Sequence, residues 1–118
     1  MGMKTALVDL DGVLNQYHGW LGEEYIHPPR DDARLLLVGL RELNFTVVIF
    51  TSRTTHLVWT WLIEHKLNEF VSDVTNIKIP ATIQVDDRAI CFNGDVNETL
   101  MAAATFQTHW EKRNAELF

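Results

Sequence analysis

The sequence predicts an α/β fold in which helices cover both faces of a mainly parallel central sheet, giving three α/β/α layers. Two observations support this fold class. Short apolar runs of strand length alternate with segments whose apolar residues recur at helical spacing. The apolar runs are continuous rather than alternating, which is typical of parallel strands buried on both faces. The length of 118 residues is typical of one domain, so residues 1–118 are expected to form a single unit.

The first half of the chain begins with a strand, a long loop and a helix. The apolar run 4–10 predicts the first strand, and the glycines and prolines of 12–30 indicate a loop. Two prolines and two aspartates within 28–32 predict the start of a helix, which Asn44 ends. A second buried strand is predicted over 45–51.

A second helix and two further strands are expected next. Ser52 or Thr54 is a candidate cap for a helix whose apolar stripe runs over 57–65. A short strand is predicted near 71–75, and another over 81–85.

The C-terminal part is predicted to hold a short outer strand at 89–92 and one final helix that runs to about Trp110. Asp95, with Glu98 three residues later, resembles a capping box at the start of that helix. Cys91 is the only cysteine, which excludes an internal disulfide, fits a reducing compartment and suggests a core position.

The composition narrows the class of protein. A formal net charge of −6 argues against general affinity for nucleic acid, because counterion release needs clustered Lys and Arg. The N-terminus lacks the apolar stretch of a signal peptide, and no run approaches membrane-spanning length. We therefore expect a cytoplasmic protein without a membrane partner, either a monomer or a homo-oligomer.

Three of the predicted strands end in polar residues: the first at Asp9, the second at Thr51, and the late one at the pair Asp86-Asp87. Ligands of open α/β sheets bind at the carboxyl ends of the strands, so these groups are expected at one edge. Asp11 lies two residues after Asp9 and shares its face while the backbone stays extended.

Such carboxylates repel one another. Two unit charges about 4 Å apart cost roughly 4 kcal/mol at an effective dielectric constant near 20. A divalent cation would offset that repulsion, and oxygen ligands without a Cys or His cluster favour Mg²⁺.

A carboxylate beside a cation suggests covalent phosphoryl transfer. One Asp can attack phosphorus, and a second can donate and accept the proton. Gly12 would let the phosphate approach the backbone, and Thr51 offers a hydroxyl near helix-start N–H groups. Lys78 would supply positive charge.

The ordered motifs resemble the haloacid dehalogenase-like (HAD) superfamily of phosphohydrolases. The first motif matches DLDGV at 9–13, and the second matches VIFTS at 48–52. The third is best matched by Lys78, and the fourth by IQVDD at 83–87. The resemblance spans most of the chain.

The resemblance implies a Rossmann-like core and a set of residue roles. Asp9 would be the nucleophile and Asp11 the acid/base, with Thr51 and Lys78 on the phosphate. The implied Mg²⁺ ligands are Asp9, the Asp11 carbonyl, and Asp86 or Asp87.

The chain departs from the family pattern in two ways. Lys78 lies only a few residues before the last strand, leaving no room for a helix there, so Lys66 is an alternative phosphate partner. No cap domain is expected, because 12–30 is long enough only for a small flap.

The candidate substrate contacts each have an alternative role. Ser52, Arg53 and Arg88 are candidate substrate contacts, although each arginine has the alternative of pairing with a nearby acid. The Asp-Asp-Arg run ending at Arg88 resembles the phosphatase domain of phage-type polynucleotide kinase/3′-phosphatases. The aromatic flap 17–27 would either stack a nucleobase or pack its rings on the domain.

The sequence thus predicts a HAD-type phosphatase, a phosphoric monoester hydrolase that uses Mg²⁺. Its expected substrates are phosphorylated compounds, with nucleotides or nucleic-acid 3′-phosphate ends preferred. The alternative is a non-hydrolytic phospho-acceptor or phosphate-binding domain of the same fold type.

Overall fold

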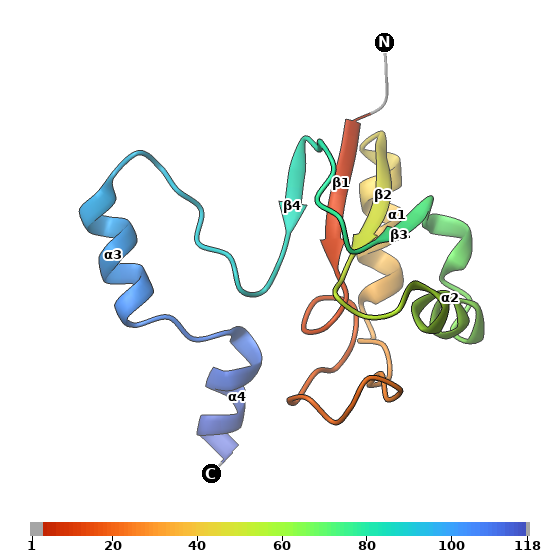
Figure 1. Ribbon diagram of the computed structural model, residues 1–118, viewed down its shortest axis with the longest axis horizontal. Coiled ribbons are helices and arrows are strands. Elements are labelled where there is room, and N and C mark those ends of the chain that lie inside the picture. The colour runs from red at the N-terminus through yellow and green to blue at the C-terminus, as the bar shows by residue number, and fades with distance from the viewer. Residues whose placement is uncertain (1–3, 118) are drawn as a thin grey trace.

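The computed structural model describes residues 4–117 and contains a four-stranded sheet whose paired strands are all parallel (Figure 1). The strands are β1 (Lys4–Asp9), β2 (Phe45–Phe50), β3 (Asp73–Thr75) and β4 (Ile83–Val85). Their spatial order is β3-β2-β1-β4. Asp9 lies opposite Phe50 of β2, and Val8 lies opposite Val85 of β4. The predicted α/β class with a parallel sheet is confirmed, and the sheet is compatible with a Rossmann-like fold.

The helices are α1 (Ala33–Glu42), α2 (Thr55–Glu64), α3 (Val96–Ala104) and α4 (His109–Leu117), with a 3₁₀ turn η1 (Asn68–Phe70). The predicted boundaries of α1 are confirmed, because it starts directly after 28–32 and Asn44 follows it with φ of 69°. Thr54 stands at the N-cap of α2, without a side-chain cap hydrogen bond. Within residues 4–117, no helix combines the length and the apolar character needed to cross a membrane.

The strand order decides which face of the sheet each connection covers. The steps from β1 to β2 and from β2 to β3 run in one direction, so right-handed crossovers place α1 and α2 on one face. The step from β3 to β4 runs the opposite way, and residues 76–82 make it across the opposite face (Figure 1). These residues form no helix, as the short spacing before 81–85 predicts.

The hydrophobic core lies between the sheet and the pair α1 and α2. Alternate residues of each strand point into this core, because successive side chains of a strand point to opposite faces of the sheet. Its fully buried members include Ala6, Val8, Leu10, Val47, Ile49, Leu37 and Leu62. Burying a large aliphatic side chain contributes about 1.5–3 kcal/mol, so this face supplies most of the apolar stabilisation.

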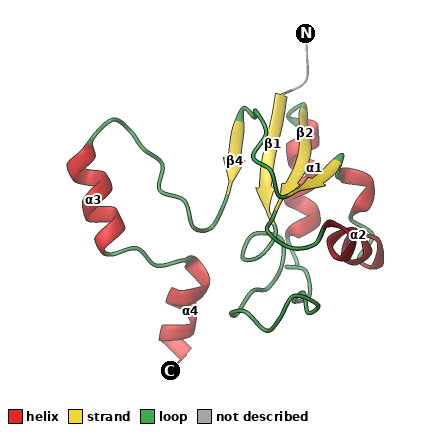
Figure 2. Cartoon of the chain, in the orientation of Figure 1, coloured by secondary structure: helices red, strands yellow, loops and turns green. Residues whose placement is uncertain are grey.

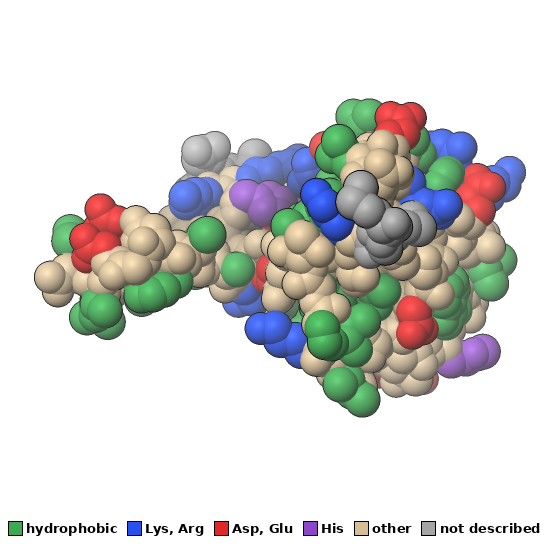
Figure 3. Space-filling view, turned by 90° about the horizontal axis from the view of Figure 1, so that it is seen from above, with side chains coloured by type: hydrophobic (Ala, Val, Ile, Leu, Met, Phe, Trp, Pro, Cys, Tyr) green, Lys and Arg blue, Asp and Glu red, His purple; other side chains and the backbone are tan. Residues whose placement is uncertain are grey.

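The predicted three-layer arrangement is not confirmed, because α3 projects away from the sheet (Figures 1 and 3). None of its residues is buried, and Val96, Leu100 and Met101 are exposed. The radius of gyration of 15.2 Å exceeds the value of about 13.5 Å for a compact chain of this length. The second face of the sheet therefore carries an extended segment where a helical layer was predicted.

The prediction of one final helix is wrong, because the chain forms two helices separated by residues 105–108 (Figure 2). Thr108 and Glu111 form a capping box at the start of α4. The Glu111 N–H donates to Thr108 Oγ1 (3.1 Å), and the Thr108 N–H donates to Glu111 Oε1 (3.3 Å). The capping box predicted for α3 is confirmed in one half, since Asp95 Oδ1 accepts a hydrogen bond from the Glu98 N–H, but the Asp95 N–H donates to Asn93 Oδ1 and not to Glu98.

Two predictions for the segment after β4 are also wrong. Residues 89–92 form no strand, and Cys91 is exposed rather than in the core. The physical reason is that the chain leaves the sheet after β4, so these residues pair with no strand. The loop 12–30 is irregular, with a single antiparallel bridge between Asn15 and Pro29.

Leu62→Ala tests the core. Leu62 is 0% exposed, whereas its neighbour Ile63 on the same helix is 59% exposed. Truncating the buried leucine should lower the free energy of unfolding by about 2–5 kcal/mol, measured by urea denaturation. Ile63→Ala is the matched control and should change it by less than about 0.5 kcal/mol. Similar losses in both variants would contradict this placement of the core.

Candidate functional site

An acidic cluster lies at the carboxyl edge of the sheet, where β1 and β4 end side by side. Asp9 is the last residue of β1, and Asp86 and Asp87 directly follow β4. Oxygens from these three carboxylates lie within 4.8 Å of one another. The chain reverses its direction of winding between β1 and β4, so the cluster lies at the topological switch point of the sheet. The predicted convergence of Asp9 with Asp86 and Asp87 is therefore confirmed.

The cluster strongly disfavours an ionised Asp9. The pKa of Asp9 is raised from 3.8 to about 9, first by burial and then by a hydrogen bond with Asp87. The negative charges of Asp86 and Asp87 raise this pKa further. Asp87 Oδ1 is buried and has no hydrogen-bond partner among the described residues. Positive charge placed between these groups would relieve both effects.

The donor set of the cluster fits a hard divalent cation. Asp9, Asp86 and Asp87 offer only carboxylate oxygens, which Mg²⁺ and Ca²⁺ prefer over the nitrogen and sulfur ligands of Zn²⁺. Asp87 Oδ1, which no described residue contacts by a hydrogen bond, supplies a ligand for such a cation. The side chain of Asp11 is not part of this cluster, and the ligand role implied for its carbonyl stays a prediction.

A cavity of about 380 Å³ opens beside Asp9 and Asp86. Its lining combines the acids with hydroxyl, aromatic and basic side chains from the flap and from the ends of β2 and β4. The lining residues are Asp9, Asp11, Tyr17, Trp20, Thr51, Ser52, Gln84, Asp86, Arg88 and Ala89. The sequence predicted six of these as site residues, so the cavity brings together the main part of the candidate site.

Three of the backbone N–H groups at and after Thr51 donate hydrogen bonds within the protein. The Thr51 N–H donates to Thr75 O (3.0 Å), and the Arg53 N–H donates to Thr51 Oγ1 (3.2 Å). The Thr54 N–H donates to Glu23 Oε1 at 2.7 Å. A flap carboxylate therefore lies at the start of α2, where the sequence suggested an anion site.

Asp11 and Arg53 form a buried ion pair. Arg53 Nε donates to Asp11 Oδ2 (2.7 Å) and Nη2 donates to Oδ1 (3.1 Å), while Asn15 Nδ2 also donates to Oδ1 (2.9 Å). The remaining guanidinium nitrogen donates to the carbonyl of Glu23 (2.9 Å). Arg53 is 1% exposed and does not line the cavity, so the structure shows the alternative pairing with an acid, and its contact with substrate stays a prediction.

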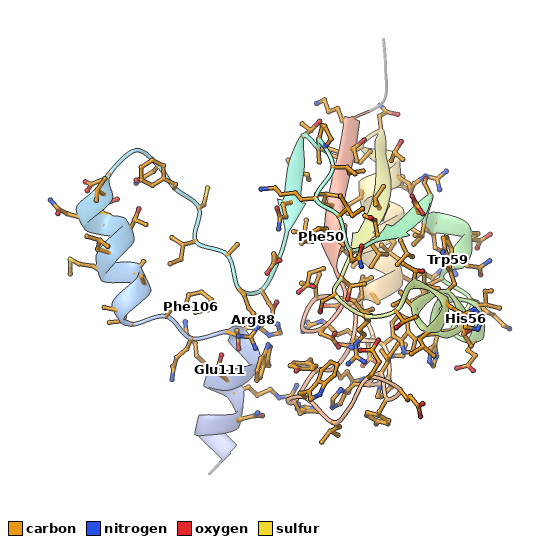
Figure 4. All side chains as sticks on the ribbon, viewed as in Figure 1. Phe50, His56, Trp59, Arg88, Phe106 and Glu111 are labelled. Atoms are coloured by element: carbon orange, nitrogen blue, oxygen red, sulfur yellow. The ribbon has the colours of Figure 1, made fainter. Side chains whose placement is uncertain are left out.

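Among the described residues, Arg88 is the only Lys or Arg whose side chain lines this cavity. Its backbone N–H donates to Asp86 Oδ1 (2.7 Å), and its guanidinium lies over the ring of Trp110, 5.3 Å from the centroid. Figure 4 shows Arg88 at the bend after β4, beside α4. The exposed side chain of Arg88 is therefore placed for contact with an anionic ligand.

The two candidate lysines lie outside the cavity. Lys78 is exposed on the crossover segment 76–82, and Lys66 is exposed directly after α2. Neither is among the residues that line the cavity. Their roles toward phosphate stay predictions, and each would require its long side chain to reach the site from outside.

Gly12 has a packing role that the sequence did not indicate. Its φ is +89°, and a Cβ at this position would lie 2.1 Å from Asp87 Oδ2. Only glycine therefore allows Asp87 to approach the first motif so closely. Gly12 does not line the cavity beside Asp9, so its predicted contact with phosphate stays a prediction.

Trp110 and His109 of α4 were missed as site residues. The sequence predicts Trp110 only as the end of a helix, yet its Nε1–H donates to Asp87 Oδ2 at 2.6 Å. His109 Nε2 forms a hydrogen bond with Gly12 O. No local motif could have signalled these contacts, because Trp110 lies 23 residues from Asp87 and His109 lies 97 residues from Gly12.

The flap packs aromatic rings on the domain. Trp20 is 56% exposed and lies over the Arg53 guanidinium, 4.7 Å away. Tyr17 contacts the ring of Trp110 edge-on at 4.9 Å. The packing interpretation is confirmed for these two rings. Because both also line the cavity, stacking of a nucleobase stays a prediction.

Comparison with protein-family models, with curated proteins and with solved structures found no match to this chain.

Asp9 should make the stability of the cation-free protein depend on pH. Its pKa is raised from 3.8 to about 9 in the folded chain. Its contribution to the free energy of unfolding is therefore full below about pH 4 and is lost as the pH rises toward about 9. Asp9→Asn removes this titration, so the Tm of the variant minus that of the parent should increase from about pH 5 to about pH 8.

Thermal unfolding in buffer with a chelator measures this difference. Asp31→Asn, which changes an exposed acid outside the cavity, is the control and should show a constant offset. A constant offset for Asp9→Asn as well would contradict the raised pKa of Asp9.

Arg53→Met tests the buried ion pair. Removing one partner of a buried pair costs about 3–5 kcal/mol. Because the Asp11 side chain is 21% exposed, we expect the low end of that range, about 3 kcal/mol by urea denaturation. Arg30→Met breaks the exposed pair with Asp32 and should cost less than about 1 kcal/mol. Equal losses of unfolding free energy in the two variants would show that the buried ion pair of Arg53 stabilises the protein no more than the exposed pair of Arg30.

Proposed function

We propose that this chain is a Mg²⁺-dependent phosphomonoester hydrolase that acts through an aspartyl-phosphate on Asp9. The convergence of Asp9, Asp86 and Asp87 beside a cavity that also holds Thr51 and Ser52 carries the proposal. It supports the resemblance to the HAD superfamily, whose motifs supply these same positions. Mg²⁺ held by Asp9, Asp86 and Asp87 would neutralise the facing carboxylates and polarise the phosphoryl oxygens.

The chemical steps follow from the side chains that line the cavity. A carboxylate oxygen of Asp9 attacks phosphorus, and the bond from phosphorus to the ester oxygen breaks. Asp11 gives a proton to the departing oxygen. It later takes a proton from a water that attacks phosphorus, and the bond from phosphorus to the Asp9 oxygen breaks, which releases inorganic phosphate and restores the Asp9 carboxylate. Thr51 and Arg88 would contact the phosphoryl oxygens. Both oxygens of Asp11 accept hydrogen bonds from Arg53, so proton transfer requires one of these contacts to loosen.

Nucleotides and nucleic-acid 3′-phosphate ends are the preferred substrates. Tyr17 and Trp20 provide aromatic faces in the same cavity as Asp9, and aromatic faces stack on bases without regard to sequence. Arg88 supplies a planar cation for a phosphate or a backbone. We place this activity in the cytoplasm, in line with the single cysteine.

A non-hydrolytic phospho-acceptor or phosphate-binding domain is the second candidate function. Two observations favour it: the Arg53 contacts occupy Asp11, and Lys78 and Lys66 do not line the cavity. Such a domain would take up phosphate at Asp9 and retain it.

Phosphate release from a panel of substrates tests both candidates. The panel holds simple phosphomonoesters, nucleotides and 3′-phosphorylated oligonucleotides, each assayed with Mg²⁺. Steady release is expected, and Asp9→Asn should lower the rate by more than about 10³-fold. Asp31→Asn should leave the rate unchanged. Equal rates for the parent and Asp9→Asn would remove Asp9 as nucleophile, and a single turnover with phosphate retained on the protein would favour the phospho-acceptor.

Lys78→Met and Lys66→Met, assayed separately on the best substrate, identify the phosphate-side lysine. We expect the larger loss of kcat/KM with Lys78→Met. A loss only with Lys66→Met would overturn that assignment.

A further inference from the structure

The carboxylate of Asp87 is held by the indole of Trp110. Trp110 Nε1–H donates to Asp87 Oδ2 at 2.6 Å, while Asp87 Oδ1 is buried and has no hydrogen-bond partner within residues 4–117. The bonded oxygen is turned toward α4, and an Asp87 oxygen lies with those of Asp9 and Asp86 within the acidic cluster. The side chain of Trp110 in α4 thus sets the rotation of the Asp87 carboxylate, which follows β4.

Trp110 is itself fixed from several sides. The Arg88 guanidinium lies over its ring at 5.3 Å, and the Tyr17 ring contacts it edge-on at 4.9 Å. The Cα of Gly12 faces Asp87 and the indole nitrogen, and a Cβ there would lie 3.0 Å from that nitrogen. His109 bonds to the carbonyl of Gly12 and ties the start of α4 to the first motif. These contacts hold the indole N–H in one position.

The chemistry of the donor matters for the cluster. An indole N–H is neutral and only donates, so it orients Asp87 without compensating its charge. A guanidinium would compensate that charge, as Arg53 does for Asp11. Asp87 Oδ1, which has no hydrogen-bond partner among the described residues, is therefore left for a cation. Without the indole, Asp87 Oδ2 would lose the hydrogen bond that sets its rotation, and repulsion from Asp86 would favour rotation of Asp87 out of the cluster.

We propose that Trp110 is a positioning residue that orients Asp87 as a ligand of a divalent cation, so that α4 completes the cation site. This inference rests on the cation site of the proposed function, but not on the hydrolysis of any substrate. Hydrogen-bond partners of metal ligands change metal affinity by about 10–100-fold when they are removed.

Trp110→Phe tests the inference, because it keeps a ring for Arg88 and Tyr17 but removes the N–H. Calorimetric titration of the folded full-length chain with MgCl₂ measures the Kd. We expect Trp110→Phe to raise the Kd by about 10-fold or more. Trp59→Phe, which changes a partly buried tryptophan of α2 outside the cavity, should change the Kd by less than about twofold.

A second comparison separates positioning from general destabilisation. Asp87→Asn removes the charged ligand, so adding Trp110→Phe in that background should change the Kd by less than about twofold. A purely structural role would lower the Tm of Trp110→Phe without Mg²⁺ and leave its Kd equal to that of the parent, which would overturn the inference. Equal effects of Trp110→Phe in both backgrounds would also overturn it.

These measurements distinguish failure of the positioning role of Trp110 from failure of the proposed hydrolase function. If the parent binds Mg²⁺ and Trp110→Phe binds it weakly, but no phosphomonoester is hydrolysed, the positioning role stands and the hydrolase falls. If hydrolysis occurs with Asp9 as nucleophile and the Kd is unchanged by Trp110→Phe, the hydrolase stands and the positioning role falls. A parent without Mg²⁺ affinity overturns both the positioning role and the cation dependence.

Discussion

The parallel pairing of β1 with β4 is the constraint on which the rest of this structure depends. Residue-by-residue pairing up to Val8 and Val85 means that both strands end together, so Asp9 and the pair Asp86-Asp87 must meet. The backbone hydrogen bonds of the sheet hold together carboxylates that repel one another. The raised pKa of Asp9 is the electrostatic consequence of that enforced proximity.

Asp11 and Asp87 have hydrogen-bond donors of different charge. Asp11 is neutralised by the buried guanidinium of Arg53, which also binds the flap carbonyl of Glu23 and so ties the flap to the first motif. Asp87 Oδ2 accepts a hydrogen bond from the neutral indole of Trp110, and Asp87 Oδ1 has no hydrogen-bond partner among the described residues. Asp11 is thereby paired with a cationic side chain, whereas Asp9, Asp86 and Asp87 form no ion pair with another described residue. This asymmetry is what makes the edge of β1 and β4 a candidate cation site.

The strand order also explains why the two faces of the sheet differ. Two crossovers in one direction bury α1 and α2 in the core, and the reversal to β4 leaves the other face to an extended segment. The chain then leaves the sheet, so α3 has no surface of its own chain to cover, and its apolar residues stay exposed. The Thr108 and Glu111 capping box starts a new helix that returns to the site.

The sequence by itself determined the local elements and the inventory of acids. Continuous apolar runs and helical spacing located the four strands and the first two helices, because these patterns depend on residues close in the chain. It also located Asp9, Thr51 and Asp86 at strand ends, since each directly follows an apolar run. Tertiary structure alone decided that Arg53 pairs with Asp11, that Gly12 makes room for Asp87, and that Trp110 reaches the cluster. Those contacts join residues far apart in the chain, and no local sequence pattern predicts which distant side chain will make the contact.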